Sequence, residues 1–253
     1  MNSIFVTGAA SGIGRATAEL FASRGYFVGL FDVDGAAVAA LAAQLGAGRA
    51  IAGELDVRDL GAFRASVAAF GAAAGGRMDV LFNCAGILRM GPFDKVPAED
   101  AHLEIAVNVG GVVNGIYASL PLLEATSGSV IVNMSSVSAV YGTPDHSVYS
   151  ATKFAVRGLT EALDIELRPR GVRVCDVMPG YVSTKMVHEQ KIKSPIVGAL
   201  GVHLEAGDVA STVWNAVQGD KVHWLMKADH ALFARLSGFS SLARAIMKHM
   251  IRP

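Results

Sequence analysis

The sequence predicts an α/β fold in which a doubly wound parallel sheet of seven strands is covered by helices on both faces. Apolar segments of strand length alternate along the chain with longer segments of helical periodicity. The strand candidates are almost uniformly apolar, as expected of a parallel sheet that is buried on both faces. No linker rich in Pro, Gly or Ser and no internal repeat interrupts this pattern, so a single domain is predicted over residues 1–226.

Strand and helix candidates follow one another in order along the chain. Strands are predicted at Ser3–Val6, Phe27–Phe31, Ala50–Leu55, Val80–Phe82, Val130–Met134, Val172–Met178 and Val222–Met226. Helices are predicted at Gly14–Arg24, Ala36–Leu45, Leu60–Ala74, Asp100–Leu122, Val148–Arg170 and Val209–Val217, with Asp59 and Asp208 as N-caps. The stretch from Met186 to Leu204 is expected to be a loop with short helical pieces.

Charge and N-terminal sequence narrow the function classes. Lys plus Arg and Asp plus Glu number 22 each, so no net field attracts nucleic acid, and we expect no nucleic-acid partner. The first residues lack the basic region and apolar core of a signal peptide. The longest uncharged stretch, Ile105–Leu123, contains Asn108 and Asn114, whose amide groups a lipid environment would leave unpaired. We therefore expect a cytoplasmic protein.

Cysteine and histidine usage predicts neither a disulfide nor a metal site. Cys84 and Cys175 each fall within an apolar, strand-like run, as small core residues of a protein in a reducing compartment do. Apart from His146, the other six histidines are not spaced as metal ligands, so no metal site is predicted.

Polar residues and glycines follow the predicted strands where these end. Because the carboxyl ends of parallel strands meet at one edge of the sheet, the sequence predicts a binding cleft there. The segments concerned are Thr7-Gly8, Asp32, Asp56-Val57, Asn83-Cys84-Ala85-Gly86, Ser135-Ser136 and Pro179-Gly180.

A glycine motif between the first strand and the first helix predicts a Rossmann-type dinucleotide site. Gly8 permits a tight turn, Gly12 lets the backbone approach a pyrophosphate, and Gly14 lets the helix pack on the strand. Asp32 ends the next strand, where a carboxylate binds the ribose hydroxyls. That carboxylate would repel a 2′-phosphate and no base follows it, so NAD is predicted rather than NADP; Arg15 is expected on an exposed face.

A second constellation is predicted around Tyr149 and Lys153, which share one face of a helix because they are four residues apart. Ser136 ends the strand before that helix. Such a Tyr and Lys pair is common by itself, but it becomes specific when it accompanies this serine and the glycine motif.

With these motifs the chain resembles the short-chain dehydrogenase/reductase family, in its compact single-domain type, from about Ser3 to about Met226. Cys84 stands where the family usually has a second Asn, and Thr152 where Ser is common. The resemblance is carried by Thr7-Gly8-x-x-x-Gly12-Ile13-Gly14, Asn83-Cys84-Ala85-Gly86, Asn108, Ser136, Tyr149-x-x-x-Lys153 and Pro179-Gly180-x-x-x-Thr184.

The resemblance implies an NAD-dependent oxidoreductase that moves a hydride between the nicotinamide and a secondary alcohol or ketone. It implies a catalytic tetrad of Asn108, Ser136, Tyr149 and Lys153. Tyr149 would be the general acid or base, and Ser136 would hold the substrate oxygen. Lys153 would bind the nicotinamide ribose and lower the pKa of the phenol, which is ordinarily about 10. Asn108 would hold a water that links Lys153 to solvent.

The resemblance also implies the remaining cofactor contacts. Asp56 and Val57 would touch the adenine, residues 83–86 would lie under the ribose, and Val182 and Thr184 would bind the carboxamide. The complete predicted set is Gly8, Ser11, Gly12, Ile13, Gly14, Asp32, Asp56, Val57, Asn83, Ala85, Gly86, Tyr149, Lys153, Pro179, Gly180, Val182 and Thr184.

Two features near the substrate leave alternatives open. The resemblance implies that residues from about 184 to 206 form a loop, which closes over the substrate in the family. Its apolar members indicate either an apolar substrate or ordinary lid packing; they include Met186, Ile192, Ile196, Val197 and Leu200. His146, in the loop before Tyr149, either hydrogen-bonds the substrate or is a solvated loop histidine, and we expect the second.

The C-terminal segment 227–253 carries an apolar stripe at helical spacing, with basic residues off the stripe. We expect it to pack on the active site or on a neighbouring subunit, with a membrane surface as the alternative for 230–252. The stripe consists of Leu232, Leu236, Phe239, Ala243, Ile246 and Met250. The resemblance also implies a homo-oligomer, expected to be a tetramer, through helices 100–122 and 148–170. Their apolar faces carry Val109, Val112, Ile116, Phe154 and Leu159.

The sequence leaves two rival functions beside this enzyme. The first is an NAD-binding regulatory or scaffold protein without turnover, but binding alone does not need Ser136, Tyr149 and Lys153 together. The second is an epimerase or dehydratase on the same fold, whose relatives usually carry a larger C-terminal substrate domain. The sequence does not identify the substrate, the direction of reaction or its stereochemistry.

Overall fold

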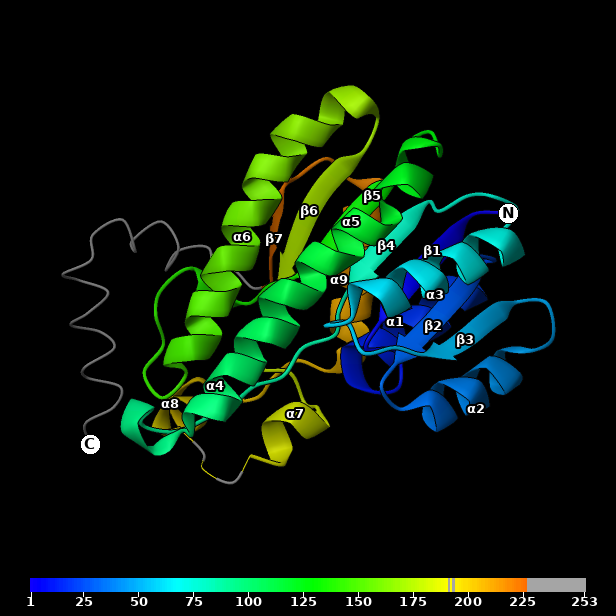
Figure 1. Cartoon of the computed structure of the whole chain (residues 1–253). Helices are drawn as coiled ribbons and strands as arrows, with labels where there is room; N and C mark the ends of the chain where they lie inside the picture. The colour runs from blue at the N-terminus through cyan, green and yellow to red at the C-terminus, as the bar shows by residue number, and fades with distance from the viewer. Residues whose placement is uncertain (191, 193, 227–253) are drawn as a thin grey trace.

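The computed structural model describes residues 1–190, 192 and 194–226, and the strands of this part form one parallel sheet (Figure 1). Its order is β3-β2-β1-β4-β5-β6-β7. The chain winds outward from β1 in one direction and then returns to continue from β4 in the other, which confirms the doubly wound fold. The strands are β1 (Ser3–Thr7), β2 (Phe27–Asp32), β3 (Ala50–Glu54), β4 (Val80–Asn83), β5 (Val130–Met134), β6 (Arg173–Met178) and β7 (His223–Leu225).

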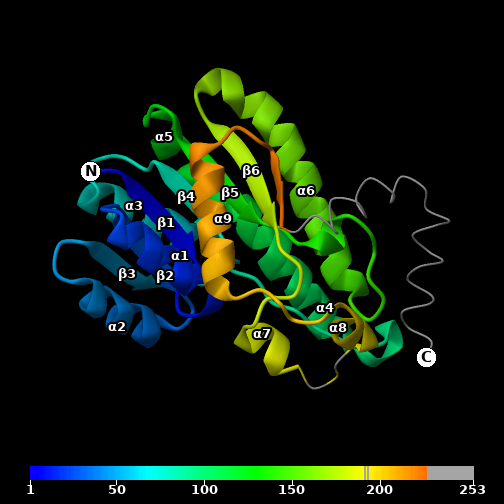
Figure 2. The ribbon, with the colours of Figure 1, turned by 180° about the vertical axis from the view of Figure 1, so that it is seen from behind.

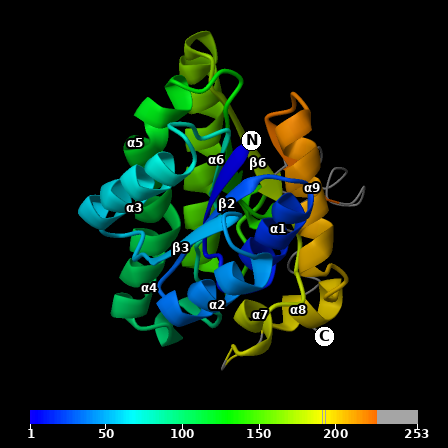
Figure 3. The same cartoon turned by 90° about the vertical axis from the view of Figure 1, so that its right-hand side faces the viewer.

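Helices cover both faces of the sheet, as Figure 3 shows. One face is covered by α1 (Gly12–Ser23), α2 (Gly35–Leu45) and α9 (Ala206–Gln218), which lie in front in Figure 2. The other is covered by α3 (Leu60–Ala73), α5 (Gly111–Glu124) and α6 (Ser147–Leu167). A separate cluster of buried apolar side chains fills the space on each side, so the sheet divides the core in two.

The predicted helix Asp100–Leu122 is confirmed as the continuous helical run Ala98–Glu124, but this run is not regular throughout. It consists of α4 (Ala98–Ile105), a wide π turn (Ala106–Gly110) and α5. The run Ala98–Glu124 is long and apolar enough to cross a membrane by length and composition alone. In this fold it covers the sheet, and its side chains Val112, Ile116 and Leu123 lie in the core.

The two predicted helix caps have different outcomes. Asp59 is confirmed as the N-cap of α3, because its carboxylate accepts a hydrogen bond from the Ala62 N–H. Asp208 is not an N-cap. Glu205 begins α9, and Asp208, three residues later, accepts a hydrogen bond from the Glu205 N–H in a reciprocal capping box.

Short elements complete the described part of the chain. The stretch predicted as a loop contains α7 (Lys185–His188) and α8 (Pro195–Leu200), which lie beyond the carboxyl ends of the strands (Figure 1). Three-residue 3₁₀ turns occur at Phe93–Lys95, Val137–Ala139 and Arg168–Arg170. The predicted apolar stripe of residues 227–253 lies outside the described residues.

Candidate active site

The glycine turn after β1 allows three backbone segments to approach closely. Gly8 has a φ of +70°, which favours glycine, and a Cβ there would lie 2.9 Å from the Ala85 Cα. A Cβ on Gly14 would lie 2.0 Å from the Gly8 carbonyl oxygen. Ser11 and Gly12 at the start of α1 line a cavity at the carboxyl edge of the sheet. The helix start therefore offers partial positive charge to an anion in that cavity.

Asp32 is held in a fixed orientation at this cavity. One carboxylate oxygen accepts a hydrogen bond from the Ala10 N–H at 3.0 Å, and the other accepts one from the Asp34 N–H at 3.1 Å. Arg15 is exposed, as predicted, and it forms an ion pair with Glu19 on the outer face of α1.

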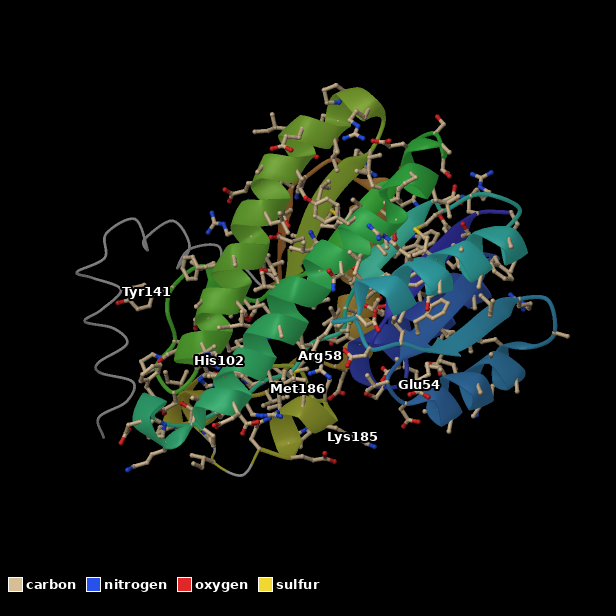
Figure 4. All side chains as sticks on the ribbon, in the orientation of Figure 1. Glu54, Arg58, His102, Tyr141, Lys185 and Met186 are labelled. Atoms are coloured by element: carbon tan, nitrogen blue, oxygen red, sulfur yellow. The ribbon has the colours of Figure 1, made fainter. Side chains whose placement is uncertain are left out.

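Arg58, which the sequence analysis did not single out, lines the cavity beside the predicted residues Asp56 and Val57. Its Nε donates to both carboxylate oxygens of Asp56 at 2.9 Å, and this hydrogen bonding holds the pKa of Asp56 below its ordinary value. Figure 4 shows Arg58 together with Met186 of α7, which also lines the cavity.

The end of β4 is positioned by Thr7, whose hydroxyl accepts hydrogen bonds from the N–H groups of Cys84 and Ala85. Cys84, Ala85 and Gly86 then line the cavity. Asn83, predicted to contact the cofactor, lies behind them instead. Its side chain donates to the Asn133 Oδ1 at 3.0 Å, within the sheet.

Ser136, Tyr149 and Lys153 line the same cavity from the end of β5 and the first turns of α6. The Ser136 side chain lies close enough to the Tyr149 hydroxyl to lower the pKa of the phenol in part. Lys153 is buried, and its Nζ donates to the Met134 carbonyl oxygen at 2.8 Å. The Nζ lies 5.4 Å from the centre of the Tyr149 ring.

The predicted lowering of the Tyr149 pKa does not arise among the groups of the chain. Burial raises the pKa of the phenol above its ordinary value, and the neighbouring Ser136 hydroxyl opposes this rise only in part. Burial also lowers the pKa of Lys153 to about 8. The reason is that both groups lose water, while the Lys153 ammonium is directed at the Met134 carbonyl.

Asn108 lies in the π turn and does not line the cavity. Its Oδ1 accepts a hydrogen bond from the Ile87 N–H at 2.8 Å, and its Nδ2 donates to the Ile87 carbonyl at 2.9 Å. Its side chain thus holds the backbone of the segment 87–89, which lines the cavity. The water that Asn108 is predicted to hold stays a prediction.

Two further residues that the sequence analysis missed hold the same segment. The buried Glu104 accepts a hydrogen bond from the Arg89 N–H at 3.0 Å. Gln190, which follows α7, donates to the Leu88 carbonyl and accepts from the Met90 N–H. The available signal for Glu104 was its position one turn before Asn108, directly before the uncharged stretch Ile105–Leu123.

The substrate loop places part of its predicted apolar set in the cavity. Met186 and Ile196 line it, whereas Ile192 contacts Gly91 and is nearly half exposed. Val197 is half-buried and lies outside the cavity lining. The side chain of Leu200 is outside the described set.

His146 is not a solvated loop histidine. It is 1% exposed, and its two ring nitrogens lie 2.9 Å from the Pro144 carbonyl oxygen and 3.4 Å from the Tyr181 hydroxyl. The expectation of solvation is wrong because the loop folds back over the cavity, which both His146 and Tyr181 line.

The cavity, of about 770 Å³, joins most of the predicted residues into one site of a size usual for ligands. The glycine turn, where a Cβ could not fit, and the fixed Asp32 carboxylate suit the pyrophosphate and ribose of a dinucleotide. The predicted residues that line the cavity are Gly8, Ser11, Gly12, Ile13, Gly14, Asp32, Asp56, Val57, Ala85, Gly86, Ser136, Tyr149, Lys153, Pro179, Gly180, Val182 and Thr184.

Comparisons with known proteins agree on one family. The profile of the family described as short chain dehydrogenase matches residues 2–194. The D-threitol dehydrogenase of Mycolicibacterium smegmatis is 37% identical over 186 residues, which are 73% of this chain and 71% of that protein. The 2,5-dichloro-2,5-cyclohexadiene-1,4-diol dehydrogenase LinX of Sphingobium indicum is 35% identical over 181 residues, 71% of this chain and 72% of that protein.

A solved structure gives the same result over a larger part of the chain. A short-chain dehydrogenase/reductase from Burkholderia phymatum, determined in complex with NAD, has a TM-score of 0.86 and 28% sequence identity. The match covers 96% of this chain and 95% of that one. Because the family profile spans most of the chain and the fold and site geometry agree with it, this protein belongs to the short-chain dehydrogenase/reductase family of oxidoreductases.

Proposed function

We propose that the protein is an NAD-dependent oxidoreductase that interconverts a secondary alcohol and its ketone. The observation that carries this proposal is the contact of Ser136 with Tyr149, beside Lys153, in a cavity that also contains Asp32 and the glycine turn. NAD, when bound, would accept or return the hydride and, in its oxidised form, add a positive charge near the phenol. Relatives whose names are those of alcohol dehydrogenases support the substrate class.

The side chains would divide the proton chemistry between them. The hydroxyls of Ser136 and Tyr149 would hold the substrate oxygen between them, and Tyr149 would take its proton as the alcohol is oxidised. Because burial raises the pKa of Tyr149, the phenol needs added positive charge to act as a base near neutral pH. Lys153, fixed by the Met134 carbonyl, would supply part of that charge and bind the ribose.

Two secondary assignments accompany this proposal. Asp32 favours NAD over NADP, because its carboxylate would repel a 2′-phosphate. The free thiols of Cys84 and Cys175 support a reducing compartment, and we assign the protein to the cytoplasm on that ground.

Replacing Tyr149 with phenylalanine tests the proposal. Tyr149→Phe keeps the ring and removes the hydroxyl, so turnover of a secondary alcohol should fall by roughly 10²–10⁴-fold. NAD affinity, measured by calorimetry, should change little. Tyr117→Phe is the matched control, because Tyr117 is exposed on α5 and outside the cavity. Near-normal turnover in Tyr149→Phe would refute the assignment.

Lys153→Met tests the role of the ammonium. The variant should bind NAD more weakly, and the limb of its pH–rate profile that reports Tyr149 should move to higher pH, because the phenolate loses a positive neighbour. A profile unchanged in position would exclude this role. A wild-type protein that binds NAD but oxidises none of a panel of secondary alcohols would instead support the regulatory or scaffold alternative.

A further inference from the structure

His146 and Tyr181 form a polar pair in the cavity wall that the proton chemistry above does not use. Tyr181 follows Pro179-Gly180 after β6, and His146 immediately precedes α6. Both side chains line the cavity, and the Tyr181 oxygen lies 3.4 Å from the His146 Nε2. Tyr149 is close enough to contribute to the raised pKa of the Tyr181 phenol, so the pair lies near the reacting hydroxyl.

The hydrogen bonds of this pair have a direction. The Pro144 carbonyl can only accept, so the His146 Nδ1, at 2.9 Å from it, must carry the ring proton. Burial lowers the pKa of His146, which keeps the imidazole neutral near pH 7. The Nε2 is therefore an acceptor, and the Tyr181 hydroxyl donates its single proton to it.

The result is a phenol oxygen that can only accept a further hydrogen bond. Its proton is directed toward His146, and its remaining lone pair is available to the cavity. A ligand that places an ether or carbonyl oxygen there gains no hydrogen bond. A ligand that places a hydroxyl group there donates a hydrogen bond to the Tyr181 oxygen. The site therefore distinguishes hydroxyl groups from ether and carbonyl oxygens.

The surrounding loop holds the pair in place before any ligand binds. The His146 N–H donates to the Thr143 carbonyl, and the His146 carbonyl accepts from the Ser150 N–H at 2.7 Å. Asp145 has a φ of +60°, and its carbonyl accepts from the Gly91 N–H, which ties the loop to the segment that follows β4. A fixed acceptor of this kind loses little entropy when a ligand binds.

We propose that Tyr181, oriented by His146, accepts a hydrogen bond from a second hydroxyl group of the substrate. The preferred substrates are then diols, in which one hydroxyl is oxidised at Tyr149 and the other remains a donor to Tyr181. The corresponding hydroxyketones are the products. This inference rests on the proposed function, because it places the second hydroxyl group of a substrate whose first hydroxyl group reacts at Tyr149.

Kinetics on a matched substrate series tests the inference. Cyclohexanol, the cyclohexanediols and the corresponding methoxycyclohexanols differ only in the second group and in its position. Wild type should show a kcat/KM for its preferred diol at least about tenfold above that for cyclohexanol, as one hydrogen bond of about 1.4 kcal/mol predicts. The methoxy compounds should show no such gain.

Two variants separate hydrogen bonding from packing. Tyr181→Phe should lower kcat/KM for the diol by about 10- to 100-fold and leave cyclohexanol nearly unchanged. His146→Phe releases the Tyr181 proton, so Tyr181 can then donate to an ether oxygen and the methoxy compounds should gain relative to cyclohexanol. A merely structural role for His146 would not produce that gain. Tyr117→Phe again serves as the control.

Binding measurements keep this test separate from that of the proposed function. Calorimetry with Tyr149→Phe in the presence of NAD compares the affinity of the diols and cyclohexanol without turnover, and the Tyr149→Phe/Tyr181→Phe double variant should lose the difference. If no alcohol is oxidised by wild type, the proposed function fails and this binding comparison still decides the role of Tyr181. Equal kcat/KM and equal affinity for diols and cyclohexanol in wild type would overturn the inference. So would a fall in kcat/KM of the same size for both substrates in Tyr181→Phe.

Discussion

The proposed preference for NAD depends on the Asp32 carboxylate, which is held in place by its own hydrogen bonds. The N–H groups of Ala10 and Asp34 each bind one of its oxygens, so the charge is fixed beside the cavity rather than free to turn away. A 2′-phosphate would have to approach this fixed charge directly. Val33, the next residue, is exposed and also lines the cavity.

Replacement of Asp32 should therefore shift cofactor preference. Asp32→Ala should reduce the ratio of kcat/KM for NAD to that for NADP by at least about tenfold, which corresponds to a lost interaction of about 1.4 kcal/mol. Asp32→Ala with Val33→Arg should reverse the preference. Asp34→Asn removes a charge two residues away, outside the cavity lining, and should leave the ratio unchanged. A wild-type preference for NADP would contradict the argument.

At the residue scale, the sequence predicted which side chains come together in the cavity. It predicted less well which partners each side chain contacts. Tyr149, Lys153 and Ser136 were predictable because helix spacing and strand ends determine their position. The burial of Asn83 behind the cavity lining and the burial of His146 were not predictable, because each depends on a long-range partner, Asn133 and Tyr181 respectively. A single sequence does not reveal such partners.

At the scale of elements, α4 and the π turn act as a support for the cavity wall. Glu104 and Asn108, one turn apart, bind the backbone of Arg89 and Ile87. The helical periodicity of the sequence predicted one continuous helix here, because the residues of the π turn are apolar except for Asn108, and the extra residue of the turn leaves no visible break in the pattern. The misplaced N-cap at Asp208 has a similar cause, since an acidic residue suits both the cap and the third helical position.

The buried carboxylate of Glu104 should make folding stability depend on pH. Burial raises its pKa from 4.5 to about 7, while the Arg89 N–H, Arg89 and Lys153 oppose the rise and Asp100 adds to it. Between these values the folded protein binds more protons than the unfolded chain, so stability falls as pH rises from 4.5 to about 7. Above about pH 7 the full free-energy cost of burying the ionised Glu104 carboxylate is present.

Glu104→Gln tests this cost while keeping an acceptor for the Arg89 N–H. At pH 8 the variant should be more stable than wild type by at most about 3 kcal/mol, and near pH 5 the difference should become small. Urea unfolding at several pH values measures both. Glu99→Gln, on the exposed side of α4, is the control. A stability difference that is the same at pH 5 and pH 8 would exclude charge burial as its cause.

At the scale of the whole molecule, the outer surface of α5 and α6 carries apolar side chains that the core does not cover. Tyr117 on α5 and Phe154 and Ile165 on α6 are exposed, Ile165 by 76%. Phe154 and Ile165 are about three helical turns apart and so share one face. Two residues predicted for this surface, Val112 and Ile116, pack in the core instead.

We therefore propose a homo-oligomer, expected to be a tetramer, that buries this face. Phe154→Glu combined with Ile165→Glu should convert it to smaller species in light scattering at micromolar concentration, because two charges would be buried without partners. Ala43→Glu, on the exposed side of α2, should leave the mass unchanged. A monomeric wild type would refute the proposal.

The two cysteines have a consequence for chemical labelling. Cys175 is buried in the core and Cys84 lies at the floor of the cavity, and burial raises the pKa of each thiol to about 12. Thiol reagents attack the thiolate, so at neutral pH both residues should react far more slowly than a free cysteine. A cysteine introduced at the exposed Ala43 should therefore be labelled by a thiol-reactive fluorophore well before Cys84 or Cys175, with both native residues kept in place.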